Sequence, residues 1–281
     1  MSSHTTLVSA EQLATHLGDP SWVLVDCRFS LQDLDAGRAA WRQGTIAGAV
    51  YASLDDDLSG EVVAGKTGRH PLPSVDRIAQ TLGAWGIGAQ TQVVAFDDKG
   101  GPFAARLWWM LRWLGHDAVA VLDGGLRAWA EAGQALAPGQ PPVRSEVFTA
   151  RPRPEMIVTA DEVLTAREAP TVAVLDARAA PRFSGEHEPI DPVAGHIAGA
   201  INAPFADNLA DDQRLLSRAL LRQRYDALLG ERGSGDAICY CGSGVTACHD
   251  ILAMAHAGLA LPRLYVGSWS EWITDPQRPR Q

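Results

Sequence analysis

Short apolar runs rich in β-branched residues alternate along the chain with segments whose apolar residues recur at helical spacing. WVLVDCR at 22–28 and AICY at 237–240 predict buried strands. TACHDILAMAHAG at 246–258 predicts a helix that ends near Gly258, because glycine commonly follows the last helical turn. LWWMLRWL at 107–114 predicts a helix packed on a sheet. Alternation of this kind is typical of a parallel sheet covered by helices.

The same order of segments occurs twice in the chain. Each segment of the first half has a counterpart in the second half at similar spacing, so chance is a poor explanation. The pairs are WVLVDCR (22–28) with AVLDAR (173–178), GTIAGAVYASLD (44–55) with GHIAGAINAPFAD (195–207), VVAFDDKGGPFAARLWWML (93–111) with AICYCGSGVTACHDILAMA (237–255), and VLDGGLRAWAEAG (121–133) with LYVGSWSEW (264–272). The sequence therefore predicts two copies of one fold.

The repeat also predicts the domain organisation of an α/β protein. We expect two tandem domains, at 1–135 and 156–281, each a mainly parallel sheet flanked by helices. The segment 136–155 is rich in proline, which lacks an amide hydrogen, so we interpret it as an extended linker. Because domain interfaces favour pockets, a ligand site is expected where the two domains meet.

Composition and charge narrow the class of protein. The 281 residues are 46% hydrophobic and carry a formal net charge of −9, which argues against nucleic acid or an anionic membrane surface as the partner. The N-terminal stretch has no targeting pattern, and no apolar run is long enough to span a bilayer. Four cysteines, three of them close together, do not resemble a secreted disulfide framework. We expect a cytoplasmic protein with reduced thiols.

The stretch CGSGVTACHD at 241–250 carries the clearest chemistry. Cys241 directly follows a predicted strand and precedes a predicted helix, a position where sites cluster in α/β sheets. Gly242 and Gly244 allow the backbone to curl, so that successive amide hydrogens point at its centre. The helix dipole adds about half a positive charge. Such a nest stabilises an anion and favours a reactive thiolate at Cys241.

CGSGVTA resembles the active-site loop of the 3-mercaptopyruvate sulfurtransferases, which are relatives of rhodanese. LDGGLRAW, GHIAGAIN and GSWSEW fit the same family, and the resemblance covers nearly the whole chain. It implies two tandem rhodanese-like domains, of which the second is catalytic. In the first domain Asp97 stands at the position aligned with Cys241, so that copy cannot carry sulfur on a cysteine.

The resemblance implies a two-step sulfur transfer without a cofactor. Cys241 takes sulfur from a donor and keeps it as a persulfide, which a second thiol or cyanide then removes. With 3-mercaptopyruvate the leaving group is an enolate that needs a proton, and Ser243 could deliver it. By the same resemblance Asp55 completes a relay with Cys241 and Ser243, and His70 lies at a further substrate position. The remaining loop residues are assigned to substrate binding: Gly242, Gly244, Val245 and Thr246.

Charge bears on the choice of donor. Thiosulfate-using relatives carry basic residues directly after the cysteine, whereas Gly242 and Ser243 are neutral, which favours 3-mercaptopyruvate. Arg182 matches the family's first substrate-binding arginine, but the position of the second arginine is Ile190. Arg178 or another residue could take its place. Thioredoxin, glutathione and cyanide are the acceptors that the resemblance implies.

Three alternatives remain beside this interpretation. Thiosulfate could be the preferred donor, or the chain could be a relay module that passes sulfur to protein thiols. A cysteine phosphatase would need an arginine six positions after the cysteine, where this chain has Ala247. A zinc site is disfavoured because paired CxxC sequences are missing; its ligands would be Cys239, Cys241, Cys248 and His249.

Several other polar and thiol groups have structural explanations. Cys27, Cys239 and Cys248 are predicted to be packed in cores as small apolar residues. Two Asp-x-Arg sequences end equivalent strands, so we predict an ion pair in each copy; these are Asp26 with Arg28 and Asp176 with Arg178.

Overall fold

The computed structural model describes residues 3–142 and 144–281, and its chain forms two compact units. Unit 1 comprises Met1–Gly60, Pro73–Arg153 and Asp211–Leu215. Unit 2 comprises Glu61–Leu72, Pro154–Ala210 and Leu216–Gln281. Each unit thus combines segments that are far apart in the sequence.

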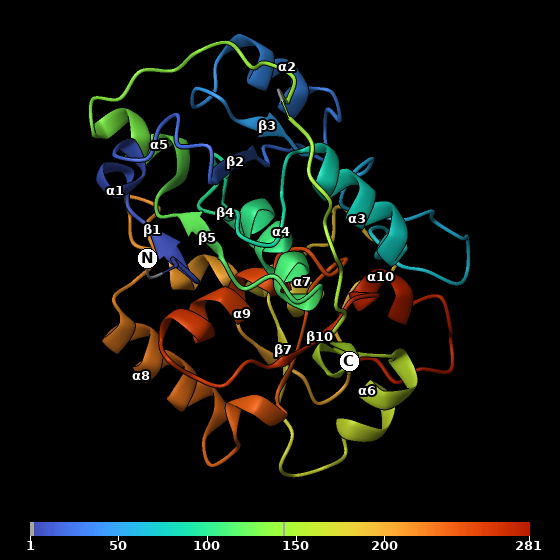
Figure 1. The fold of residues 1–281 in the computed structure, drawn as a ribbon. Helices are drawn as coiled ribbons and strands as arrows, with labels where there is room; N and C mark the ends of the chain where they lie inside the picture. The colour runs from blue at the N-terminus through green and yellow to red at the C-terminus, as the bar shows by residue number, and fades with distance from the viewer. Residues whose placement is uncertain (1–2, 143) are drawn as a thin grey trace. The chain divides into compact units, whose positions relative to one another are not determined.

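Unit 1 is built on a five-stranded parallel sheet with the strand order β1-β5-β4-β2-β3, drawn from blue to green in Figure 1. Its central strands are rich in valine and almost fully buried, as expected for a sheet covered on both faces. The strands are β1 (Leu7–Val8), β2 (Trp22–Asp26), β3 (Val50–Tyr51), β4 (Gln92–Phe96) and β5 (Val119–Leu122). The helices are α1 (Ala10–Ala14), α2 (Ala36–Gln43), α3 (Val75–Ala84), α4 (Pro102–Trp113) and α5 (Gly125–Glu131).

Unit 2 repeats this topology with the strand order β6-β10-β9-β7-β8, again all parallel. Its strands are β6 (Ile157–Val158), β7 (Val174–Asp176), β8 (Ile201–Asn202), β9 (Ile238–Tyr240) and β10 (Arg263–Tyr265). Its helices are α6 (Ala160–Ala166), α7 (Ala180–Phe183), α8 (Arg218–Leu229), α9 (Ala247–His256) and α10 (Ser268–Trp272). Short 3₁₀ turns are η1 (Pro154–Met156), η2 (Phe205–Asn208) and η3 (Ser234–Asp236). The predicted α/β class and the internal repeat are confirmed.

The first helix of each unit begins with the same local device. Ser9 caps α1 and Thr159 caps α6, each in a capping box with the residue three positions later, Gln12 or Glu162. In both boxes a side-chain oxygen accepts the orphan N–H groups of the first turn. The helix α9 ends as the sequence predicts, with Gly258 at a φ of +75°, a conformation that glycine adopts without strain.

The two predicted ion pairs are confirmed and occupy equivalent places. Arg28 Nη2 lies 2.6 Å from Asp26 Oδ2, and Arg178 Nη2 lies 2.6 Å from Asp176 Oδ2. Each arginine also donates to a backbone carbonyl, that of Gly44 in unit 1 and of Gly195 in unit 2. Both pairs are buried, and their bidentate contacts fix the carboxyl ends of β2 and β7.

The proline-rich segment interpreted as a linker runs along unit 1 up to Arg153. The Glu146 N–H donates to the Gly83 carbonyl at 2.8 Å, and Phe148 is buried. Between Glu146 and Arg153, three backbone donors therefore find carbonyl partners in unit 1, since the N–H groups of Arg151 and Arg153 donate to Leu114 and Trp113. Within the described residues, no helix combines the length and the apolar character that crossing a bilayer requires.

Candidate active site

Cys241 lies where the sequence places it, between β9 and the turn that leads into α9. Cys241 is buried, with 2% of its surface exposed. The backbone around it is tied to the start of α10: the Cys241 N–H donates to Ser268 Oγ at 3.1 Å, and the Trp269 N–H donates to the Cys241 carbonyl at 3.0 Å. The Ser270 N–H donates to the next carbonyl, that of Gly242, at 2.9 Å. These bonds hold the loop in one conformation.

Unit 1 shows what a loop of this form binds. Asp97 follows β4 at the position that corresponds to Cys241, and its buried carboxylate accepts four backbone N–H groups at 2.9–3.0 Å. The donors belong to Lys99, Gly101, Phe103 and Ala104. Burial raises the pKa of Asp97, and these four hydrogen bonds act against that rise. The loop of unit 1 is therefore an amide nest filled by a carboxylate of the chain itself.

The two loops agree at one glycine and differ at the next residue, where Gly101 has a φ of +101° and its counterpart Val245 is not left-handed. Gly244 has a φ of +75° and its counterpart Gly100 has a φ of +82°. A Cβ at Gly244 would collide with the backbone carbonyl of Val266, so only glycine fits there. The bond from Trp269 to the Cys241 carbonyl also has a counterpart of equal length at the Asp97 carbonyl, 3.0 Å.

The amides that correspond to the donors of unit 1 belong to Ser243, Val245, Ala247 and Cys248. The Cys248 N–H donates to the Val245 carbonyl at 3.1 Å and is not available. In the described part of the chain, no acceptor is found for the N–H groups of Ser243 and Val245, and that of Ala247 opens α9, where a helix leaves its first N–H groups unpaired. These three N–H groups correspond in the repeat to donors of the Asp97 nest.

Ser243 is paired with His70. The Oγ of Ser243 lies 2.8 Å from Nδ1 of His70, and both residues are buried. His70 comes from the Glu61–Leu72 segment, which belongs to unit 2 although it precedes that unit's sheet by many residues. A hydroxyl bonded to an imidazole can pass a proton in either direction. The structure thus brings together two residues that the sequence assigned to separate roles.

Arg182 lies beside the loop, and its expected role in binding the substrate stays a prediction. Its Nη1 and Nη2 atoms would lie 3.5 and 3.4 Å from a Cβ at Gly242. Glu188 and Asp191 hold the guanidinium, with N–O distances of 2.9 and 3.0 Å. Ile190, by contrast, is 41% exposed.

The rhodanese-like domain model matches the chain twice, at residues 9–132 and 159–275. The chain belongs to the rhodanese-like family. A protein of Pseudomonas aeruginosa named a probable 3-mercaptopyruvate sulfurtransferase is 50% identical over 99% of this chain and 98% of its own. SseB of Mycobacterium tuberculosis, provisionally named a thiosulfate sulfurtransferase, is 42% identical over 97% of this chain and 95% of its own.

A solved structure gives the same result. The chain resembles SseA from Escherichia coli, a structure described under the 3-mercaptopyruvate sulfotransferases, with a TM-score of 0.82 and 31% identity. The match covers 95% of this chain and 100% of that one. These comparisons confirm the predicted tandem rhodanese fold and the sulfurtransferase class.

Three further residues that the sequence assigned to the site are Val245, Thr246 and Asp55. Val245 is buried in the turn, and Thr246 precedes α9 without a capping hydrogen bond from its side chain. Asp55 belongs to unit 1, where burial and the neighbouring Asp56 raise the pKa of its carboxyl group. Its part in a relay stays a prediction.

The three remaining cysteines are buried free thiols, as predicted. Burial raises the pKa of both Cys27 and Cys239 well above the usual range, so neither is a nucleophile near neutral pH. The Sγ of Cys248 donates to the Gly244 carbonyl at 3.4 Å and so contacts the active-site loop. Among the described residues, no group of three or more His, Cys, Asp or Glu side chains is arranged to hold a metal ion.

Ser268 was missed by sequence reasoning. It has a φ of +54°, which is unusual for a residue with a side chain, and its counterpart in unit 1 is Gly125 with a φ of +55°. Its Oγ donates to the Tyr265 carbonyl at 2.9 Å and accepts the Cys241 N–H. The signal was present, because the repeat aligns GG at 124–125 with GS at 267–268. The strained backbone of Ser268 is thus found at the residue whose hydroxyl group holds the Cys241 backbone.

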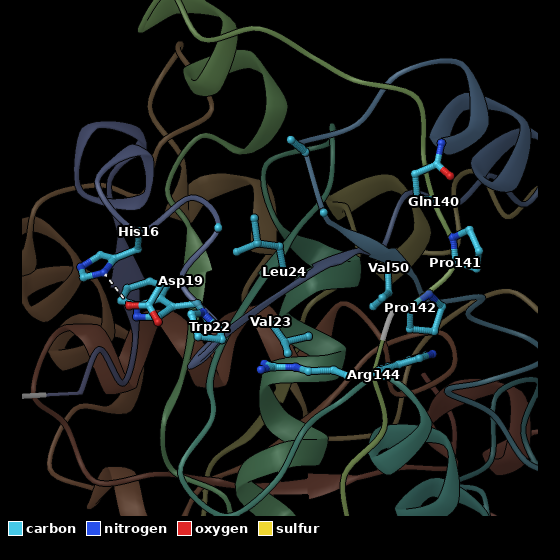
Figure 2. Close-up of a pocket in the computed structure, with 15 residues that line it drawn as sticks. His16, Asp19, Trp22, Val23, Leu24, Val50, Gln140, Pro141, Pro142 and Arg144 are labelled. Atoms are coloured by element: carbon cyan, nitrogen blue, oxygen red, sulfur yellow. Dashed lines mark ion pairs between the residues drawn. The ribbon is translucent and has the colours of Figure 1, made fainter.

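Figure 2 shows a pocket within unit 1 that has a volume of about 290 Å³. Its wall includes Trp22 from β2, the pair His16–Asp19, and Arg144 from the proline-rich segment. Its described lining contains none of the expected site residues, and we assign it no role in the reaction.

Asp250, on α9, provides a test of stability near the site. It is buried, its Oδ1 accepts from Asn208 and Tyr225, and burial raises the pKa of its carboxyl group to about 7. Because the folded pKa lies above the unfolded value, this carboxyl group contributes most to the stability of the fold below about pH 4. The contribution falls as the pH rises to about 7. The wild-type chain should therefore lose about 1–4 kcal/mol of folding stability between pH 5 and pH 8, and Asp250→Asn should not show this loss.

Urea unfolding at both pH values measures this effect. The wild-type chain should lose more stability than Asp250→Asn on going from pH 5 to pH 8. Parallel losses in the two proteins would show that Asp250 ionises as freely in the folded state as in the unfolded state.

Proposed function

We propose that the chain is a 3-mercaptopyruvate sulfurtransferase that transfers sulfur to a thiol or to cyanide through a persulfide on Cys241. The amide nest around Cys241 carries this proposal. The corresponding loop in unit 1 binds the Asp97 carboxylate with four backbone N–H groups. A nest of that kind favours an anionic sulfur at Cys241 and, after transfer, an anionic persulfide.

The first half-reaction breaks one C–S bond and forms one S–S bond. The Cys241 thiolate attacks the donor sulfur with its electron pair, and the pair of the C–S bond stays on carbon as the enolate of pyruvate. A proton completes pyruvate, and the outer sulfur remains bound to Cys241.

Ser243 and His70 supply the proton in this proposal. Their 2.8 Å contact allows the Ser243 hydroxyl to give its proton to the enolate while the imidazole replaces it. Both groups are buried, which keeps bulk water from competing with the relay. In the second half-reaction an acceptor thiolate attacks the outer sulfur, and the Cys241 thiolate leaves into the same nest. Cyanide, glutathione and thioredoxin are the proposed acceptors.

Local charge favours a monoanionic donor over thiosulfate. The positions after Cys241 are Gly242 and Ser243, which are neutral, and the guanidinium of Arg182 is already paired with two carboxylates. A dianion would therefore meet little uncompensated positive charge. The relative named as a thiosulfate sulfurtransferase keeps thiosulfate as the second candidate donor.

Incubation of the protein with 3-mercaptopyruvate tests the proposal. Pyruvate should be released, and intact-mass analysis should show about 32 Da of added mass that maps to Cys241 and disappears with cyanide. The value of kcat/KM for 3-mercaptopyruvate should exceed that for thiosulfate. Faster turnover of thiosulfate would make the second candidate the correct one, and pyruvate release without a persulfide would contradict the mechanism.

A further inference from the structure

We propose that Arg69 and Arg182 together bind the carboxylate of the donor, and that Arg69 fills the role of the arginine that is absent at Ile190. This inference rests on the proposed function and names the residue that selects its substrate. Arg69 was not among the residues that the sequence assigned to the site.

The backbone of Arg69 is fixed against the start of α10. Gly68 packs so closely on the Gly267 carbonyl that a Cβ at residue 68 would collide with it. The Arg69 N–H donates to Ser270 Oγ at 3.1 Å. Since the Ser270 N–H itself holds the Gly242 carbonyl, the Glu61–Leu72 segment and the active-site loop share one anchor. Arg69 is thus a built part of unit 2.

The guanidinium groups of Arg69 and Arg182 converge beside the residue that follows the nucleophile. The Nη2 of Arg69 would lie 2.9 Å from a Cβ at Gly242, and Nη1 and Nη2 of Arg182 would lie 3.5 and 3.4 Å from it. Both arginines also form ion pairs with the same buried carboxylate, that of Asp191. Asp191 therefore holds the two cations side by side.

Each arginine has a terminal nitrogen left over, and both of these nitrogens lie close to Gly242. Asp191 takes Nη1 of Arg69, while Glu188 and Asp191 take Nε and Nη2 of Arg182. Within the described residues, Nη2 of Arg69 and Nη1 of Arg182 have no hydrogen-bond acceptor, and neither has the buried Nε of Arg69. A carboxylate accepts two such N–H groups at once.

Ile190 and Arg69 share one surface pocket. This pocket of about 290 Å³ is lined by both residues together with Asp191 and Ser270. A guanidinium can thus reach this region from residue 69 as well as from residue 190. The connected cluster contains three cations and three anions, so it is balanced before substrate binds; these are Arg69, Arg178 and Arg182 with Asp176, Glu188 and Asp191. Adding one negative charge costs less here than adding two.

The first measurement is steady-state kinetics with 3-mercaptopyruvate. Arg69→Gln should raise KM about tenfold, equivalent to about 1.4 kcal/mol, while kcat changes less than twofold. Arg69→Lys should recover part of the loss, because an ammonium keeps the charge but loses the planar fork. In the Arg69→Gln background, Ile190→Arg should lower KM again. The matched control is Arg222→Gln, which removes an exposed arginine of α8 that forms an ion pair with Asp226.

The second measurement does not depend on sulfur transfer. Iodoacetate and iodoacetamide both alkylate a thiolate with loss of iodide, but only iodoacetate carries a carboxylate. The ratio of their rates at Cys241, followed by mass analysis, should fall about tenfold in Arg69→Gln and stay unchanged in Arg222→Gln. An equal slowing of both reagents would show that Arg69 only shapes the loop, and unchanged KM would also overturn the inference. A wild-type protein that fails to release pyruvate contradicts the proposed function, whereas the alkylation ratio still tests Arg69.

Discussion

Cys241→Ser should lower the release of pyruvate from 3-mercaptopyruvate by about a thousandfold or more. A serine hydroxyl is not ionised near neutral pH, and the amide nest cannot supply the nucleophilic strength that sulfur provides. The backbone bonds of residue 241 to Ser268 and Trp269 do not involve its side chain, so the loop should keep its conformation. The measurement is the initial rate of pyruvate formation, with intact mass as a second readout.

Cys27→Ala is the matched control for this variant. Cys27 is also a buried free thiol, but it lies in unit 1 with a pKa raised by burial. Its loss should cost about 1 kcal/mol of stability and leave turnover within twofold. Turnover by Cys241→Ser above one per cent of wild type, or added mass that maps to Cys27, would place the sulfur elsewhere and contradict the mechanism.

The sequence alone predicts most of this fold because the repeat shows its pattern twice. The strands β2, β7 and β9, the helices α4 and α9, and the buried ion pair of each unit follow from apolar spacing and from the Asp-x-Arg sequences. The position of Cys241 at the end of β9 follows in the same way. Local patterns suffice wherever the contacts are local.

Contacts across long stretches of sequence are the part that the sequence does not predict. The pairing of His70 with Ser243 and the approach of Arg69 to Gly242 depend on the Glu61–Leu72 segment folding with unit 2. Nothing in the composition of that segment indicates with which unit it folds. The sequence showed that the family's second arginine is replaced by Ile190, but it did not show that Arg69 could take its place. The expected role of Asp55 stays a prediction, because it also depends on a contact between residues that are far apart in the sequence.

Asp97→Ala should destabilise unit 1 by about 3–5 kcal/mol, the largest effect on folding that we expect. The substitution leaves four buried N–H groups without their acceptor, and each unpaired donor costs about 1–3 kcal/mol before the loop relaxes. Asp97→Asn should also destabilise unit 1. Its side-chain amide keeps one acceptor oxygen, but its NH₂ group would face backbone N–H groups, which are donors as well. Urea unfolding followed by the tryptophan fluorescence of unit 1 measures the change.

Asp98→Ala provides the control, since Asp98 is the exposed neighbour and its loss should stay within about 0.5 kcal/mol. Equal stabilities of Asp97→Ala and Asp98→Ala would mean that the loop does not require an anion. That result would also remove the main support for an anionic sulfur at Cys241, because the two loops share the conformation of Gly100 and Gly244 and the hydrogen bond to the carbonyl of Asp97 or Cys241. Asp97 therefore tests the active-site nest in a unit where no cysteine chemistry interferes.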